Sequence, residues 1–345
     1  MVSIKNFDYS LPKSLIAQEP AMERHGSRLL VYNLKNRDIK HKKFADIIDF
    51  LRKGDIVVIN DTKVIKTRLH GKKKTGGNAA ITIISHKQGR VYEAFVKCKN
   101  PIIGTKLLFD EGLAGTIAGK IEDRFLVRFN RSAETVENIL EKKGDYTLPG
   151  YIKNTEYDRQ RYQTVFAEQE GSIAAPTAGL HFSEKLMRAL EKKGVRFARV
   201  RLHVGIGTFQ EIKEDDYTKH EMHEEWVEVP EETAQMINER KGRLGKEGKL
   251  FIVGTTALRA LETATDTRGK VHPYNGRTKL FVYPGYKFKL KFDGMITNFH
   301  LPRSTLLLLI ATIIGNGDDW KRIYEEAKKK KYRFYSFGDA MMILL

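Results

Sequence analysis

Residues 249–264 read KLFIVGTTALRALETA, and the local pattern changes at the glycine in the middle of this stretch. The four apolar residues LFIV indicate a short buried strand. Gly254 and the two threonines after it are typical of a tight turn. The apolar residues of ALRALETA then recur with helical spacing. The stretch therefore predicts a strand, a turn and a helix in immediate succession, as in α/β proteins.

The sequence on both sides adds further strands and helices in a mixed order. IVVI at 56–59 predicts a buried strand, and SEKLMRALEKKG at 183–194 predicts a helix that begins after Ser183. The apolar run at 306–315 is about half as long as a bilayer-spanning helix, so it predicts a buried helix. Further strands are predicted at 195–205, 278–285 (TKLFVYPG) and within 289–299, and further helices at 230–243 and 320–332.

Residues 64–147 are dominated by short β-rich pieces. ITIISH, VYEAFVK, TKLLFD, GTIAGKI and RFLVRF are separated by glycine, asparagine or charged turns. Short strands at such regular spacing are typical of a small barrel or sandwich. We therefore expect a larger α/β (mixed α+β) domain, residues 1–63 plus 148–345, with a small all-β barrel domain inserted at 64–147.

The composition limits the class of protein and its partners. The 345 residues carry 61 basic and 43 acidic side chains, a net charge of +18. This charge favours a polyanionic partner such as nucleic acid, and the alternative is a lysine-rich solvated surface. The single cysteine, Cys98, excludes an internal disulfide and a multi-cysteine metal site. With no apolar run near the N-terminus, we expect a soluble cytoplasmic protein without a membrane segment.

The glycine–threonine turn at 254–256 is a candidate anion site. Backbone N–H groups at the start of a helix, together with the helix dipole, can hold a phosphate or a carboxylate. Arg259 lies one turn further along and can bind the same anion through its guanidinium group. The alternative is that Thr255 or Thr256 only caps the helix.

Two histidine-containing stretches indicate other kinds of site. HVGIGTF at 203–209 contains G-x-G, but Gln210 follows, so the dinucleotide-binding pattern is incomplete. KHEMHEEW at 219–226 has the order H-E-x-H, which is not the H-E-x-x-H of helical zinc proteases. Its histidines and glutamates, Glu225 among them, are either acid–base or polar binding residues, or solvated charges of a surface turn.

Three further stretches admit a functional and a purely structural interpretation. In TNFHLPRST, at 297–305, His300 and Arg303 either face a ligand or flank a capped buried helix. In YRFYSFGDA, at 332–340, Arg333 and the aromatic residues either stack on bases or fill the core. GSIAAPTAGLHF, at 171–182, offers only Thr177 and His181 for chemistry, and it is either a wall against a flat ligand or a tightly packed loop.

Taken together and in this order, these stretches resemble the S-adenosylmethionine:tRNA ribosyltransferase-isomerase family of queuosine biosynthesis. The resemblance runs nearly end to end. Two residues depart from the family pattern: Glu170 stands where proline is common, and Arg201 where threonine is common. The matching stretches are 7–20, 27–33, 59–71, 161–183, 202–210, 220–226, 253–262, 281–288, 296–311 and 332–341.

The resemblance implies the reaction and its partners. A member of this family transfers the ribosyl part of S-adenosylmethionine to 7-aminomethyl-7-deazaguanine at the tRNA wobble position. The products are epoxyqueuosine-tRNA, adenine and methionine. S-adenosylmethionine is then a substrate, no cofactor or metal is expected, and the partner is the tRNA anticodon stem-loop, bound by a monomer.

The resemblance also suggests roles for individual residues. A base must remove a proton from the 5′ carbon beside the sulfonium, and a clamp must hold the substrate. We expect His181, His203 and Glu225 to transfer protons, and Asp61 and Asp339 to orient the amine or the hydroxyls. The expected substrate-binding residues are Thr177, Thr255, Thr256, Arg259, His300, Arg303 and Arg333, with the methionine carboxylate on Thr255, Thr256 and Arg259.

Two other classes of protein remain open at this point. A tRNA methyltransferase would also consume S-adenosylmethionine, but it would leave the methyl group on the RNA. A non-catalytic RNA-binding protein would not need threonine, histidine and arginine clustered in small-residue loops.

Overall fold

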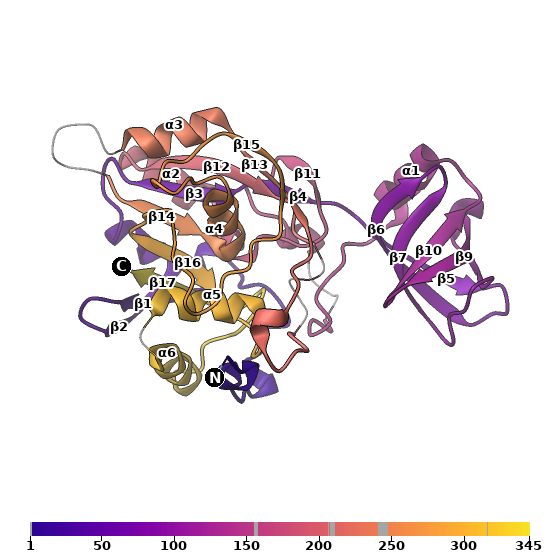
Figure 1. Cartoon of the computed structure of the whole chain (residues 1–345), viewed down its shortest axis with the longest axis horizontal. Coiled ribbons are helices and arrows are strands. Elements are labelled where there is room, and N and C mark those ends of the chain that lie inside the picture. Colours follow the sequence, from indigo (N-terminus) through magenta and orange to yellow (C-terminus); the bar gives the residue numbers. More distant parts are fainter. Residues whose placement is uncertain (1, 155–157, 206, 208–210, 241–247, 316) are drawn as a thin grey trace. The chain divides into compact units, whose positions relative to one another are not determined.

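The computed structural model describes residues 2–154, 158–205, 207, 211–240, 248–315 and 317–345. The chain divides into two compact units (Figure 1). The larger unit combines Met1–Lys63 with Pro149–Leu345, and the barrel unit is Val64–Leu148.

The larger unit is built on a nine-stranded mixed sheet with the order β15-β13-β12-β3-β14-β16-β17-β1-β2. The central strands β12, β3, β14 and β16 run parallel to one another. Towards the edges, β13 and β17 run antiparallel to this central group, and β1 is parallel to β17. The strands are β1 Arg28–Asn33, β2 Asp38–Lys43, β3 Ile56–Asn60, β12 Arg196–Leu202, β13 Glu225–Val229, β14 Leu250–Val253, β15 Tyr274–Thr278, β16 Gly294–Asn298 and β17 Ala340–Leu344.

Both faces of this sheet are covered, which explains the continuous apolar run of the predicted strand at 56–59. Side chains alternate between the faces of a strand. Ile56 and Val58 therefore pack in one core cluster, and Val57 and Ile59 pack in another. The first cluster includes residues of α3 Glu231–Glu239, α4 Gly254–Thr263, α5 Thr305–Ile314 and α6 Asp319–Lys329, and the second includes residues of α2 Glu184–Lys192 and the 3-10 helices η4 Phe44–Asp49 and η7 Thr177–His181 (Figure 1).

Two of the predicted helices begin after a capping serine. The Ser183 hydroxyl accepts a hydrogen bond from the N–H of Leu186 at the start of α2. The Ser304 hydroxyl does the same for Leu307 at the start of the buried helix α5, which ends at Gly315 in the left-handed conformation. Each of these serines satisfies a backbone donor that the helix itself leaves free.

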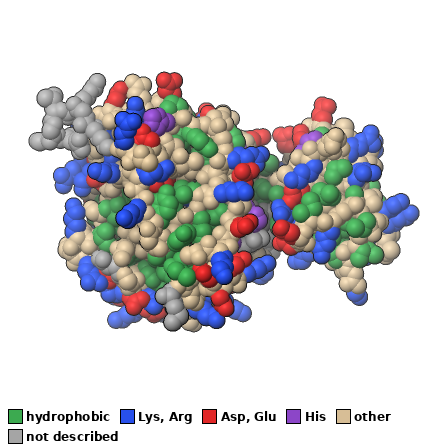
Figure 2. Space-filling model, viewed as in Figure 1, with side chains coloured by type: hydrophobic (Ala, Val, Ile, Leu, Met, Phe, Trp, Pro, Cys, Tyr) green, Lys and Arg blue, Asp and Glu red, His purple; other side chains and the backbone are tan. Residues whose placement is uncertain are grey.

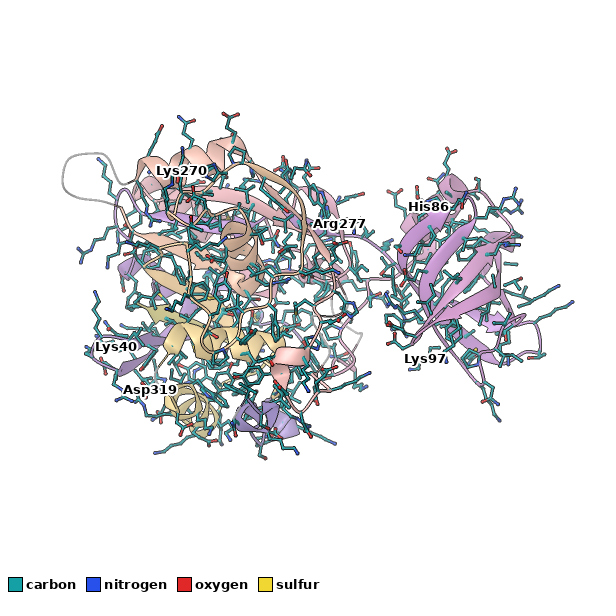
Figure 3. The ribbon with its side chains drawn as sticks, in the orientation of Figure 1. Lys40, His86, Lys97, Lys270, Arg277 and Asp319 are labelled. Carbon is teal, nitrogen blue, oxygen red and sulfur yellow. The ribbon has the colours of Figure 1, made fainter. Side chains whose placement is uncertain are left out.

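The start of α6 is held to the neighbouring edge of the sheet by a buried carboxylate. Asp319 accepts hydrogen bonds from the Tyr32 hydroxyl (2.8 Å) and from Nε of Arg37 (2.9 Å). Figure 3 labels Asp319 at this end of α6. The hydrogen bond to the Arg37 guanidinium lowers the pKa of the Asp319 carboxyl. The helix therefore carries a charge-assisted anchor as well as its apolar contacts.

The barrel unit is a closed antiparallel barrel of six strands in the order β10-β7-β6-β5-β8-β9. Its core is a separate cluster that includes Ile81, Ile117 and Val127. The predicted fold class, a mixed α/β part with a small β-barrel, is confirmed. The barrel strands are β5 Arg68–Lys73, β6 Asn78–Gln88, β7 Val91–Cys98, β8 Lys106–Leu108, β9 Ala114–Ile121 and β10 Arg124–Phe129, and a small two-stranded sheet pairs β4 Thr62–Val64 with β11 Gln169–Ser172.

Two local predictions differ from the structure. The β-rich segment ends in a helix, α1 Ala133–Lys143, whose Val136, Ile139 and Leu140 are buried with helical spacing. The strand predicted at 278–285 instead lies at Tyr274–Thr278. The chain leaves the sheet after Thr278, and the carbonyl of Leu280 accepts a hydrogen bond from Nε of Arg259.

The charged side chains are spread over both units. Figure 2 shows Lys and Arg across the visible surface of each unit, with Asp and Glu between them. Within the part of the chain that the structure describes, no helix is long and apolar enough to cross a membrane.

Candidate active site

The candidate residues gather where the parallel strands of the large sheet end, because of the strand directions. We call this end of the sheet its carboxyl edge. The parallel strands β12, β3, β14 and β16 all end at this edge, and their ends lead into His203, Asp61, Thr255 and His300. The antiparallel strands begin there, so Glu225 opens β13 and Asp339 directly precedes β17. Ligands of open α/β sheets bind beyond the carboxyl ends of the parallel strands.

His181 is buried at this edge, and both of its ring nitrogens have partners. Nδ1 lies 2.7 Å from the Ser27 hydroxyl, and Nε2 lies 3.1 Å from the amide nitrogen of Asn298. The imidazole also stacks on the ring of Phe44. Burial, together with the nearby positive charges of Arg333 and Arg24, lowers the pKa of His181 to about 3.

The hydrogen bonds of Asn298 determine which nitrogen of His181 carries the proton. The Asn298 amide nitrogen donates to the carbonyl oxygen of Tyr335 (3.2 Å), and its side-chain oxygen accepts from the Thr177 hydroxyl (3.0 Å). The group that faces Nε2 of His181 is therefore a donor, and Nε2 must accept. The proton of the neutral ring is then on Nδ1, which donates to Ser27.

Two hollows adjoin this group of hydrogen-bonded residues. The first, which we call the aromatic hollow, comprises about 450 Å³ of empty space, part of it open to solvent, and its lining has no acidic or basic side chain other than histidine. Thr177 and Asn298 line it, and so do Tyr151, Ala175, Phe299, His300, Leu301, Ser304, Leu306, Tyr335 and Ser336.

The second, which we call the arginine hollow, comprises about 270 Å³ of empty space, part of it open to solvent. Ser336 lines both hollows, and His181 lines the second one. The other residues around the arginine hollow are Pro20, Ala21, Arg24, Ser27, Arg161, Leu180, Phe337 and Gly338.

His300 lines the aromatic hollow with one ring nitrogen engaged. Nε2 lies 3.0 Å from the Thr297 hydroxyl, whereas the buried Nδ1 has no hydrogen-bond partner among the described residues. Burial lowers the pKa of His300 to about 3. The ring is therefore neutral near pH 7.

The start of α4 combines polar side chains with a buried ion pair. Arg259 forms an ion pair with Glu225, and the exposed fractions of the two side chains are 5% and 6%. The other Glu225 oxygen accepts from the N–H of Gly205 (3.0 Å). Nη2 of Arg259 is buried and has no hydrogen-bond partner among the described residues.

Neither threonine at this helix start is a cap. The N-cap position of α4 is Val253, and no side chain there accepts a hydrogen bond from the first turn. The hydroxyl of Thr256 instead accepts from the side-chain amide of Asn60 (3.1 Å), and Thr255 is also buried. The interpretation of Thr255 or Thr256 as a simple N-cap is therefore wrong.

His203 directly follows β12, whose neighbours in the sheet are β3 and β13. Its Nδ1 is 2.8 Å from the Thr62 hydroxyl, and its ring stacks on Trp226. Burial lowers the pKa of His203, and the positive charge of Arg201 adds to this effect. Gly171 has φ +146°, and a Cβ there would lie 2.5 Å from the His203 ring, so only glycine allows this close approach.

Asp61 lies near His203 but is completely buried and paired. Nε of Arg201 donates to Oδ1 of Asp61 (3.0 Å), and Nη1 of Arg201 donates to Glu228 (2.6 Å). Burial raises the pKa of the Asp61 carboxyl despite the adjacent arginine. Arg201, which departs from the family pattern, thus compensates the charges of two acidic residues.

The remaining candidates stabilise backbone or lie further out. Asp339 is buried and accepts from the backbone N–H groups of Arg28 (2.9 Å) and Arg333 (2.8 Å). The Arg333 guanidinium donates to the carbonyl of Glu19 (3.4 Å). Arg303 is half-exposed and forms an ion pair with Glu211 (3.3 Å).

One sequence motif lies partly outside the described residues, and another does not form a metal cluster. In HVGIGTF and the glutamine after it, positions 206 and 208–210 lie outside the described part of the chain. In KHEMHEEW, His220 contacts Glu214 (3.1 Å) whereas Glu225 contacts Arg259. No group of three metal-ligating side chains occurs among the residues that could be searched, which are the described ones.

Comparison with known proteins agrees with the resemblance. The family model for the queuosine biosynthesis protein matches residues 4–343. The chain belongs to this queuosine biosynthesis family. Proteins named S-adenosylmethionine:tRNA ribosyltransferase-isomerase, from Thermotoga maritima and Thermotoga petrophila, are each 45% identical over 344 residues, which is 99% of this chain and 100% of theirs.

A solved structure supports the same family assignment. The crystal structure of S-adenosylmethionine tRNA ribosyltransferase from Thermotoga maritima, at 2.00 Å resolution, is similar with a TM-score of 0.55 and 34% identity. The similarity covers 98% of this chain and 100% of that one.

Several residues of the site in this family member were not predicted from its sequence. Asn298 and Ser27 fix the orientation of His181, and Arg24 and Arg161 line the arginine hollow. Asn298 and Ser27 do lie in the stretches that resemble the family, at 296–311 and 27–33, so motif membership could have included them. Arg24 lies outside those stretches, and nothing local in the sequence distinguishes it.

Glu170, the other departure from the family pattern, has a simple local environment. Its carboxylate pairs with Nζ of Lys63 at 2.8 Å, and both side chains are exposed. An exposed pair of this kind contributes little to stability.

Proposed function

We propose that this chain is an S-adenosylmethionine:tRNA ribosyltransferase-isomerase. It transfers and isomerises the ribosyl part of S-adenosylmethionine onto 7-aminomethyl-7-deazaguanine at the wobble position of tRNA. Epoxyqueuosine-tRNA, adenine and methionine are the products. The names of the full-length relatives and the family match support this activity.

The observation that carries the proposal is the gathering of acid–base, anion-binding and aromatic groups at the carboxyl edge of the sheet. A flat base fits an aromatic hollow that lacks acidic and lysine or arginine side chains, such as the one beside Asn298. The hydroxyl and amide groups of Thr177 and Asn298 give that hollow directional hydrogen bonds. These features exceed what simple RNA binding requires.

The first chemical step requires an unprotonated base near neutral pH. Lowered pKa values keep the rings of His181 and His203 neutral near pH 7, so neither is already protonated when the reaction begins. Both nitrogens of His181 are hydrogen-bonded, whereas His203 uses only Nδ1 within the described residues. We therefore assign the proton abstraction to His203 and the later proton transfers to His181 and Glu225.

The start of α4 fits the methionine end of S-adenosylmethionine. The N–H groups of the first turn and Nη2 of Arg259, which has no hydrogen-bond partner among the described residues, are donors for the carboxylate. Glu225 is an acceptor for the ammonium group on the same carbon. Thr255 and Thr256 lie at this end of the helix, so one site offers partners for both charges.

The other candidate residues support these groups in the proposal. Asp61 acts through Arg201, and Asp339 holds the turn that carries Arg333. His300 lines the aromatic hollow, and Arg303 directly precedes Ser304, which also lines it. The reaction uses S-adenosylmethionine as a substrate and needs no further cofactor, and we infer that a cytoplasmic monomer binds the tRNA anticodon stem-loop.

One incubation tests the activity. Purified protein is mixed with S-adenosylmethionine and tRNA that carries 7-aminomethyl-7-deazaguanine, and adenine release and RNA mass are followed together. Free adenine with a heavier tRNA is the expected result. A methyl-sized mass gain without adenine would assign a methyltransferase, and bound but unchanged tRNA would assign an RNA-binding protein.

His203→Gln and the exposed Arg188→Gln form a matched pair in this assay. Loss of a general base lowers the rate by about 10²- to 10⁴-fold. We expect that loss for His203→Gln and an unchanged rate for Arg188→Gln. An unchanged rate for His203→Gln would remove this assignment.

A further inference from the structure

The arginine hollow carries positive charge that no carboxylate in its lining neutralises. Arg24 and Arg161 both line it, next to Ser27 and Ser336. Nη1 of Arg24 donates to the carbonyl of Leu180 (3.3 Å). The two Nη atoms of Arg161 donate to the carbonyls of Met22 (3.0 Å) and Ala21 (2.7 Å).

These backbone contacts orient the guanidinium groups without cancelling their charge. A carbonyl accepts a hydrogen bond but carries no net charge, so each arginine keeps its full positive charge. Burial lowers the pKa of Arg24, and the neighbouring charge of Arg161 lowers it further, while Asp158 has the opposite effect. Two close arginines aligned by backbone form a site for an anion with several acceptor oxygens.

The two hollows together offer the two chemical environments that a nucleotide within a chain presents. Ser336 lines both of them, and the Asn298–His181 hydrogen bond connects a residue of one to a residue of the other. One hollow is aromatic and has no carboxylate, lysine or arginine in its lining; the other is cationic. A nucleotide joins an uncharged base to a phosphodiester through one ribose, and single-stranded RNA is recognised with its bases splayed out.

S-adenosylmethionine does not fit the arginine hollow as well. Its methionine end carries an ammonium group on the same carbon as the carboxylate, and its sulfonium is also positive. The arginine hollow offers two cations and no carboxylate in its lining. The site at the start of α4, where Glu225 lies beside Arg259, provides a partner for each charge.

We propose that Arg24 and Arg161 bind a backbone phosphodiester of the RNA next to the wobble nucleotide. This proposal rests on the proposed function and adds to it the face that receives the RNA. The nucleotide's base occupies the aromatic hollow, and its phosphate lies on the two guanidinium groups. The two arginines are RNA-positioning residues, and they take no part in proton transfer.

The test measures RNA affinity without turnover. An anticodon stem-loop RNA is titrated into wild type, Arg24→Gln, Arg161→Gln and Arg188→Gln at several salt concentrations, without S-adenosylmethionine. Arg188 is the matched control because its side chain on α2 is 68% exposed. Loss of a charge-assisted contact is expected to weaken binding by about 10- to 100-fold for each of the first two variants. The slope of log affinity against log salt should fall by about 0.7 to 1.

A chemical change in the RNA identifies the contacted phosphate. A neutral methylphosphonate replaces one phosphodiester at a time on either side of the wobble nucleotide. At the contacted position this RNA should bind wild type more weakly. The further loss should be smaller in Arg24→Gln, which keeps the Arg161 contact, and absent in the double variant Arg24→Gln with Arg161→Gln, because the changes then remove the same contacts. Additive losses at both positions would overturn the proposal.

Other results also decide the question. Unchanged RNA affinity and salt slope in both variants would overturn the proposal, and so would a selective loss of S-adenosylmethionine affinity, which would identify a carboxylate occupant. Thermal unfolding checks that each variant folds, and Arg24→Lys and Arg161→Lys, which keep the charge, should retain most of the salt slope. Adenine release is a separate readout, so failure of the activity and failure of the phosphate site are distinguishable.

Discussion

Glu225 and Arg259 form an ion pair whose side chains are almost completely excluded from solvent. If Glu225 is changed to Gln, the Arg259 charge remains buried without its partner. Removal of one member of a buried pair costs about 3–5 kcal/mol. We expect Glu225→Gln to lower the free energy of unfolding by that amount in urea titrations. The double variant Glu225→Leu with Arg259→Met should recover most of the loss. Equal losses of unfolding free energy in Glu225→Gln and in the double variant would contradict this interpretation.

His181 makes stability depend on pH. Its pKa is about 3 in the folded protein because the ring is buried, whereas an unfolded histidine titrates near 6.5. Between these values the unfolded state binds the additional proton, so this stabilisation is complete above pH 6.5 and is lost as the pH falls towards 3.

The variant His181→Gln tests this dependence. Without the titrating ring, the loss of unfolding free energy between pH 7 and pH 5 should be smaller than in wild type by about 2 kcal/mol. Urea unfolding at the two pH values measures the difference. Equal losses in both proteins would show that the His181 ring is protonated freely in the folded state.

At the scale of single elements, local sequence patterns predicted what local forces determine. The run at 56–59 became β3, and the apolar run at 306–315 became α5, because each pattern matches the burial of that element. The shift of a predicted strand to Tyr274–Thr278 has a non-local cause. The Leu280 carbonyl binds Arg259, which is 21 residues away in the chain.

The site shows the same division between local and non-local information. The motifs identified His181, His203 and Arg259 as candidate site residues. Their partners depend on strand order, since Ser27 and Asn298 are 154 and 117 residues away from His181. No local pattern in a single sequence indicates contacts over such sequence separations. The tautomer of His181 could therefore be assigned only from the structure.

The glycine of β11 illustrates how one element positions a functional side chain. Gly171 has φ +146°, and a Cβ there would lie 2.5 Å from the His203 ring. Gly171→Ala should displace the ring, lower adenine release and destabilise the fold by about 1–3 kcal/mol. Gly150→Ala is the matched control because a Cβ at that position meets no atom within 4 Å. Equal activity of the two variants would contradict the role of this contact.

At the scale of the whole molecule, the separate cores of the two units predict separate unfolding. Ile117 is fully buried in the barrel core, and Ile56 is fully buried in the sheet of the larger unit. Both tryptophans of the chain, Trp226 and Trp320, belong to the larger unit. Tryptophan fluorescence therefore reports on that unit alone.

A matched pair of core variants tests whether residues 64–147 behave as an inserted domain. Ile117→Ala and Ile56→Ala each create a cavity that costs about 2–5 kcal/mol. For Ile117→Ala we expect an unchanged urea midpoint by fluorescence and an earlier component by far-ultraviolet circular dichroism. For Ile56→Ala the fluorescence midpoint itself should fall. A fluorescence midpoint that falls equally in both variants would mean that the two cores unfold as one cooperative unit, because destabilisation in either core would then reach the tryptophans.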